Sequence, residues 1–130
     1  MKKLLSTLLI FGCLAILYSQ NIQFTDQVLK AKLLQSSPDN MIATNTSGTF
    51  FAIDADGDGE ISFTEAALVQ GLRMDYAQIM SISDLQNFPN LVLLHVGNNS
   101  LTSLNLTGFT KLEELRCNWT HWSPPMFRRQ

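Results

Sequence analysis

One twelve-residue stretch of the chain, DADGDGEISFTE from position 54 to 65, carries five carboxylates and two glycines. Asp54, Asp56 and Asp58 fall at positions 1, 3 and 5 of a twelve-residue calcium loop, and Glu65 falls at position 12. Gly59 takes position 6, where the sharp turn requires a backbone with positive φ that glycine adopts freely. Calcium takes about six to eight oxygen ligands, and this spacing wraps oxygens around one point. The stretch therefore predicts a calcium site.

The remaining ligands of this predicted site come from the second half of the loop. Glu60 would offer its backbone carbonyl, and Ser62 would act through a water or its hydroxyl. Ile61 should point into the core and hold the loop to the fold. The predicted metal site, with Ca²⁺ as the cofactor, thus comprises Asp54, Asp56, Asp58, Glu60, Ser62 and Glu65. The alternative is an acidic turn in which Ser62 and Glu65 only form a helix-capping box.

This loop stands alone in the chain, without the partner loop of a paired EF-hand. The residues before it, NTSGTFFAI, do not have the pattern of a helix, whereas the residues from Ser62 onward do. A single EF-hand-like loop with only an exit helix is expected to be structural rather than a sensor. Extracellular modules of this kind bind calcium with a Kd of about 10⁻⁴–10⁻³ M.

The segments around the loop include one further helix. FTDQVLKAKLL predicts a helix that begins at Thr25 or Asp26, because either side chain can accept hydrogen bonds from the first-turn amides. The helix should end at the Ser-Ser-Pro stretch 36–38. DNMIATNTSGT is polar and irregular, so a surface loop is expected over residues 39–49.

A sequence repeat occupies the second half of the chain. LVLLHVGNNSL, residues 91–101, fits the pattern L-x-x-L-x-L-x-x-N-x-L, and shifts of 21 or 22 residues place apolar residues on apolar residues. This period lies within the leucine-rich-repeat range of about 20–29 residues. Each coil would contribute one short strand, and an amide such as Asn99 would bridge backbone groups at the bend. A helical hairpin is the alternative, but LTSLNLTGF alternates with the period of a strand.

Between the inward-pointing residues of the predicted strands lie positions that should face outward. The candidates for contact with a protein or glycan ligand are Arg73, Leu93, His95, Glu114 and Arg116. His95 is expected on the exposed side of its strand, and Cys117 is expected in the core rather than as a reactive thiol. Because no nucleophile–base pattern or zinc motif occurs, the sequence does not indicate an enzyme.

The first twenty residues have the pattern of a secretory signal peptide. Lys2 and Lys3 precede an apolar run from Leu4 to Tyr18, which is shorter than the roughly 20 residues that span a bilayer. A retained membrane anchor and a lipoprotein signal ending at Cys13 are the alternatives. Removal of residues 1–20 leaves seven basic and eleven acidic residues, a net charge of −4. A secreted or cell-surface protein without a nucleic-acid partner is therefore expected.

The order of these features resembles the secreted leucine-rich-repeat proteins of Bacteroidetes-type bacteria. The resemblance rests on IDADGDGEISFTEA followed by L..L.V..N.LTSLNL and covers residues 1 to about 118. It implies a curved solenoid covered at its N-terminal end by the helix and the calcium loop. It also implies Asp54, Asp56, Asp58 and Glu65 as ligands. The ending NWTHWSPPMFRRQ departs from the repeat, so a truncated member is expected.

The predicted fold class is α/β, a short leucine-rich-repeat solenoid with an N-terminal helix and calcium-loop cap. Five segments are expected: a signal peptide (1–20), helix and loop (21–49), calcium loop and exit helix (50–68), two and a fraction repeats (69–122) and an irregular tail (123–130). The predicted function is a secreted or surface, calcium-stabilised module for protein or glycan binding or adhesion. An assembly or anchoring role is a variant of it, and the non-catalytic N-terminal part of a larger secreted hydrolase is the alternative.

Overall fold

A computed structural model describes residues 20–118 and 127–128 of the chain. The elements occur in the order α2 (Gln27–Leu34), β1 (Ala43–Asn45), α3 (Phe63–Ala66), β2 (Val69–Arg73), the 3₁₀ helix η1 (Ser83–Asn87), β3 (Leu93–His95), β4 (Glu114–Arg116) and β5 (Phe127–Arg128). The predicted signal peptide except Gln20, the lipoprotein alternative at Cys13 and the predicted tail except β5 lie outside the described residues. Within the described part, no helix combines the length and apolar character needed to cross a membrane.

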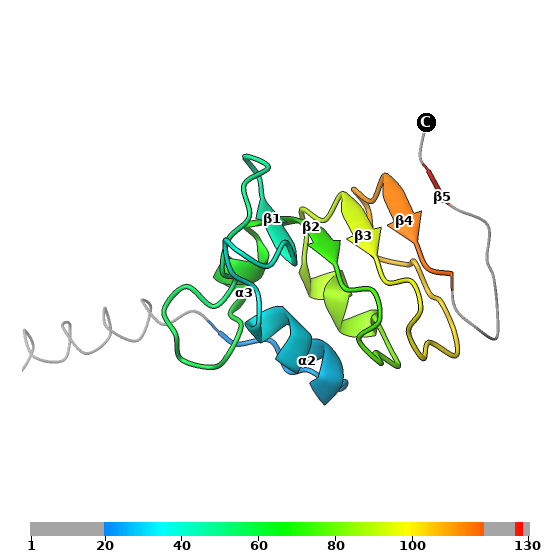
Figure 1. Cartoon of the computed structure of the whole chain (residues 1–130), viewed down its shortest axis with the longest axis horizontal. Helices are drawn as coiled ribbons and strands as arrows, with labels where there is room; N and C mark the ends of the chain where they lie inside the picture. Colours follow the sequence, from blue (N-terminus) through cyan, green and yellow to red (C-terminus); the bar gives the residue numbers. More distant parts are fainter. Residues whose placement is uncertain (1–19, 119–126, 129–130) are drawn as a thin grey trace, which may run out of the picture.

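The strands form one mixed sheet in the order β1-β2-β3-β4-β5 (Figure 1). The three middle strands are parallel and pair in register, so that Leu72, Leu94 and Leu115 lie in one row across the sheet. Strand β1 pairs with β2 and strand β5 pairs with β4, both antiparallel. The spacings of 22 and 21 residues found in the sequence are the spacings of this register.

The predicted fold, a short leucine-rich-repeat solenoid, is wrong. The described residues form a small mixed α/β fold, with antiparallel strands at both edges of the sheet, and not a leucine-rich-repeat solenoid. A sequence period predicts only that equivalent residues pair in register in neighbouring strands. It does not determine the direction of the edge strands or the form of the connections, one of which contains η1 and another only turns.

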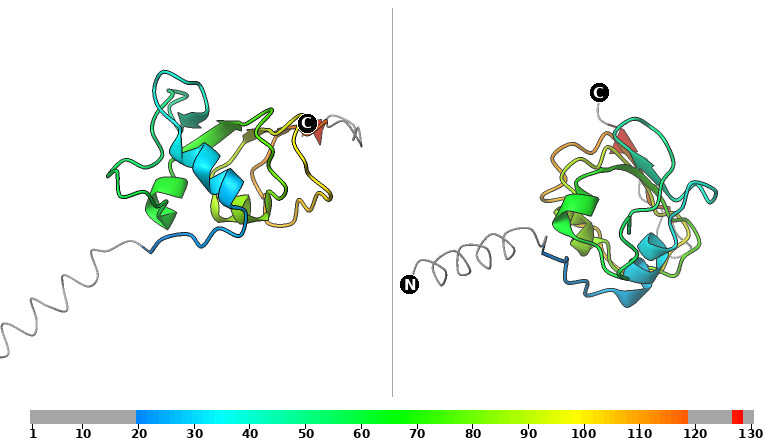
Figure 2. Two further views of the ribbon diagram at one scale, coloured as in Figure 1. Left: turned by 60° about the horizontal axis from the view of Figure 1, so that its bottom comes forward. Right: turned by 90° about the vertical axis from the view of Figure 1, so that its left-hand side faces the viewer.

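One hydrophobic core joins the sheet to the N-terminal part of the chain. Viewed along the row of strands (Figure 2, right), the strands lie on one side of the core and α2 lies on the other. The core combines Leu29 and Leu33 of α2 with the inward residues of the parallel strands. As predicted, Cys117 is buried, and the Asn99 amide bridges backbone groups of two neighbouring turns. Burial of these side chains is the main stabilising contribution to the fold.

Helix α2 begins where the sequence predicts, because the Asp26 side chain accepts hydrogen bonds from the Val28 and Leu29 amides. The other oxygen of the same carboxylate accepts from the Met80 and Ser81 amides, which lie 54 and 55 residues further along the chain. Asp26 therefore attaches the start of helix α2 to the turn before η1.

Candidate metal centre

The acidic loop projects from the core between two buried isoleucines. Ile53 and Ile61 are fully buried on either side of the exposed residues 55–59. The Ile53 amide donates to Ser36 Oγ at the end of α2 (2.9 Å), and the Ile22 amide donates to the Ile61 carbonyl (2.8 Å). The prediction that Ile61 points into the core is confirmed. Both ends of the loop are thus fixed to the fold, while its middle is in solvent.

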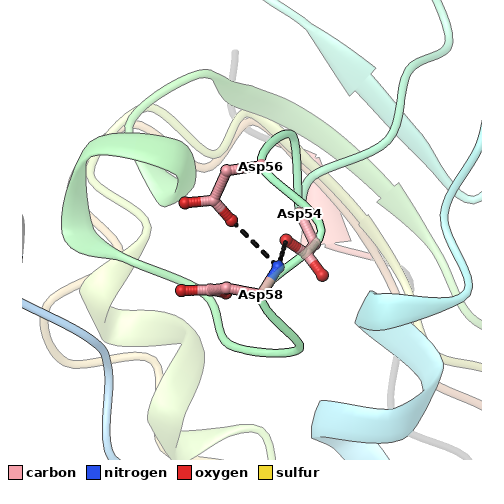
Figure 3. Close-up of side chains that lie close together, drawn as sticks. All are labelled: Asp54, Asp56 and Asp58. Atoms are coloured by element: carbon pink, nitrogen blue, oxygen red, sulfur yellow. Dashed lines mark hydrogen bonds between the residues drawn. The ribbon is translucent and has the colours of Figure 1, made fainter.

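Three aspartates converge in this loop (Figure 3). Asp54, Asp56 and Asp58 each offer a carboxylate oxygen, and these oxygens all lie within 4.8 Å of one another. Asp54 is half-buried, and the other two side chains are exposed. The three carboxylates could hold a metal ion. Carboxylate oxygens suit hard divalent cations.

Hydrogen bonds from the backbone of the loop fix the orientation of these carboxylates. Asp54 accepts from the amides of Gly57, Asp58 and Gly59 at distances of 2.8 to 3.2 Å. Asp56 accepts from the Asp58 amide at 3.1 Å, and Figure 3 draws the bonds from this amide to Asp54 and to Asp56. Gly57 and Gly59 have φ of 72° and 79°, values that a side chain would strain. The sequence predicted this conformation at Gly59 but not at Gly57.

The clustered charge affects Asp56 in particular. The hydrogen bond from the Asp58 amide lowers the pKa of the Asp56 carboxyl. Partial desolvation, the charges of Asp58 and Glu65 and a side-chain contact with Asp54 act in the other direction, and the pKa of Asp56 is raised overall. Neighbouring negative charges disfavour one another's ionised form. A cation among the three carboxylates would relieve this repulsion.

The other predicted ligands lie at the rim of the loop rather than among the three aspartates. Glu65 completes the predicted capping box, since its Oε2 accepts from the amide and the hydroxyl of Ser62, both at 2.9 Å. Its Oε1 accepts from the Ala55 amide at 2.9 Å, so one carboxylate joins the two ends of the loop. The Glu60 side chain forms an ion pair with Lys30 of α2 (2.8 Å). The sequence had no local signal for this last contact, because its partners are thirty residues apart.

The predicted ligand-contact residues occupy two rows on the opposite face of the sheet from the core leucines. Arg73, His95 and Arg116 pair in register across β2, β3 and β4. Leu93 and Glu114 lie two residues earlier in their strands, in the neighbouring row of the same face. Glu114 Oε1 lies 2.9 Å from His95 Nε2 and 3.3 Å from Arg116 Nε. His95 lies on the predicted outer side of its strand, but its exposed fraction is only 9%, because it lies in register between Arg73 and Arg116 of the neighbouring strands.

The fold and the acidic loop define a small mixed α/β protein with a candidate site for a cation. In comparisons with known proteins, no protein-family model matches the chain and no solved structure matches it.

Proposed function

We propose that the protein is a non-enzymatic binding module whose N-terminal part is stabilised by calcium in the acidic loop. The observation that carries this proposal is the convergence of Asp54, Asp56 and Asp58 within 4.8 Å of one another. Calcium is favoured over magnesium because the loop offers several carboxylate and carbonyl oxygens without rigid octahedral geometry. The signal-like N-terminus supports a secreted or surface location, where calcium is abundant enough to fill a weak site.

Glu65 is the further residue that this proposal assigns to the site. In the structure its carboxylate bridges Ala55 and Ser62. Its place at position 12 of the loop favours a role as a ligand once a cation is bound. Glu60 would contribute its backbone carbonyl and Ser62 its hydroxyl or a bound water.

The test is a thermal melt of the protein in calcium, magnesium or chelator. With a Kd of about 10⁻⁴–10⁻³ M, 10 mM calcium should stabilise the fold by about 1.4–2.7 kcal/mol. This corresponds to a rise in Tm of roughly 5–15 °C for a domain of this size. Magnesium should give a smaller rise.

Two charge-matched variants make the melt specific. Asp56→Asn removes one carboxylate charge from the cluster, and its amide oxygen still accepts the single hydrogen bond that Asp56 receives from Asp58. It should lose most of the calcium shift. Asp39→Asn removes one exposed charge outside the loop and should keep the full shift. A Tm that does not respond to calcium in the unmodified protein would contradict the proposal.

A further inference from the structure

The outer face of the parallel strands carries an arginine whose charge has no anionic partner among the described residues. Arg73 lies at the β2 end of the row that continues through His95 and Arg116. The two other members of the row share Glu114, whose Oε1 lies within 3.3 Å of both. In parallel strands that pair in register, residues of one row point to the same face. The row therefore contains two guanidinium groups and no carboxylate of its own, and Glu114 of the neighbouring row pairs with the side chains from β3 and β4.

The guanidinium of Arg73 is partly covered but not satisfied. Its central carbon lies 5.6 Å from the centroid of the half-buried Phe50 ring, in a cation–π contact. Its Nη1 atom is buried and has no hydrogen-bond partner. A buried donor without an acceptor destabilises the fold, so such a group calls for an explanation. The ring contact holds the side chain in place without accepting this N–H in a hydrogen bond.

We propose that Arg73 is the anchor of a binding site for a carboxylate, and that the carboxylate belongs to an acidic side chain of an extended peptide segment of a partner protein. The planar fork of arginine donors matches the two oxygens of a carboxylate. Binding would draw the guanidinium away from Phe50 and give Nη1 an acceptor. The inference rests on the proposed function as a binding module.

The neighbours of Arg73 favour a peptide as the source of this carboxylate. Leu93 lies half-buried in the adjacent row, and the Phe50 ring lies beside the guanidinium. An extended peptide places alternate side chains on one face, so an acidic side chain and a nearby apolar one can reach the arginine and these apolar groups together. A carboxylated glycan would supply the charge without the apolar side chain.

The test measures binding of a fluorescein-labelled peptide of four Glu-Leu repeats by fluorescence anisotropy in calcium. A matched peptide of four Gln-Leu repeats has the same apolar groups without the carboxylates. The Glu-Leu peptide should bind at least tenfold more tightly than the Gln-Leu peptide. Arg73→Met should remove this difference, whereas Arg73→Lys should retain part of it. Lys111→Met, which removes an exposed cation outside the strands, should change the affinity less than threefold.

Three results would overturn the inference. The first is equal binding of the two peptides, and the second is unchanged binding of the Glu-Leu peptide by Arg73→Met. The third is displacement of the peptide by polygalacturonate at a lower concentration of carboxylate groups than the peptide itself requires, when this displacement also depends on Arg73. The last result would identify a glycan as the ligand. The calcium melt separates the two proposals. A normal calcium shift without peptide binding contradicts only the carboxylate site, and peptide binding without a calcium shift contradicts only the metal site.

Discussion

Asp26 joins two distant parts of the backbone through one carboxylate. Burial raises the pKa of this carboxyl, but the hydrogen bonds from Met80, Leu29, Ser81 and Val28 together lower it below the ordinary value of 3.8. Asp84 makes a related contact, because it accepts from the amides of Thr25 and Asp26. The start of α2 is therefore held by two buried carboxylates.

The depressed pKa of Asp26 predicts a dependence of stability on pH. A group with a lower pKa in the folded state than in the unfolded state stabilises the fold fully above its unfolded pKa, and this contribution is lost as the pH falls through the folded pKa. Asp26→Asn leaves one side-chain oxygen to accept from the amides at the start of α2 and from those of the turn before η1. It should lower the free energy of unfolding by about 2–4 kcal/mol at pH 7. In urea titrations, the difference from the unmodified protein should narrow below pH 4. A difference that is constant from pH 7 to pH 3 would contradict this account.

Local signals in the sequence predicted individual residues well. The capping box of Ser62 and Glu65, the capping aspartate of α2 and the spacing of the three clustered aspartates all depend on neighbours within a few positions. Contacts between distant residues left no such signal. The partners Thr25 and Asp84 are 59 residues apart. The burial of His95 likewise depends on side chains of other strands.

At the scale of elements, Asn99 holds two neighbouring turns of the chain together. Its Oδ1 accepts from the Ala77 and Ile79 amides, both at 3.0 Å. Its Nδ2 donates to the carbonyls of Met74, Val96 and Gly97 at 2.8 to 3.2 Å. The side chain is buried, so water cannot replace these partners if the amide is removed.

Replacement of Asn99 should therefore destabilise the fold strongly. Asn99→Asp keeps the acceptor but places a negative charge beside three carbonyl oxygens, and it should lower the free energy of unfolding by about 3 kcal/mol or more at pH 7. Chemical denaturation measures this change. Ser100→Ala, at the exposed neighbouring position, should change stability by less than about 0.5 kcal/mol. Equal effects of the two variants would mean that the Asn99 amide does not connect the turns.

The sequence did not predict strand β1 or the form of the sheet. Residues 39–49 were expected to form a surface loop, because their polar composition lacks strand periodicity. In the structure Ala43, Thr44 and Asn45 pair with β2, and Thr44 Oγ1 lies so close to Gly71 that a Cβ there would meet it at 2.5 Å. The pairing follows from a glycine in another strand. The composition of residues 39–49 alone therefore cannot predict that they pair with β2.

At the scale of the whole molecule, the acidic loop belongs to the same core as the sheet. Ile53 and Ile61 are buried in the cluster that contains Leu72 and Leu94. Unfolding of the segments around Ile53 and Ile61 would expose this shared core. A cation in the loop should consequently stabilise residues far from it as well as its own ligands.

Hydrogen exchange can measure this coupling. The amides of Met74 and Val96, which bond to carbonyls of the next strand, should exchange through global unfolding. Calcium at ten times its Kd should slow their exchange about elevenfold, since a ligand of the folded state alone stabilises it by RT ln(1 + [L]/Kd). If calcium slowed only the amides of residues 54–65, the loop would be an independent unit.

The buried thiol of Cys117 can report how often the structure opens near β4. Cys117 is the one cysteine among residues 20–118, it is 97% hidden from solvent, and burial raises the pKa of its thiol. A maleimide or disulfide reagent can reach such a sulfur only when the surrounding packing separates, because the reactive form is the solvated thiolate. In protein with Cys13 replaced, the labelling rate therefore reports how often this end of the sheet opens.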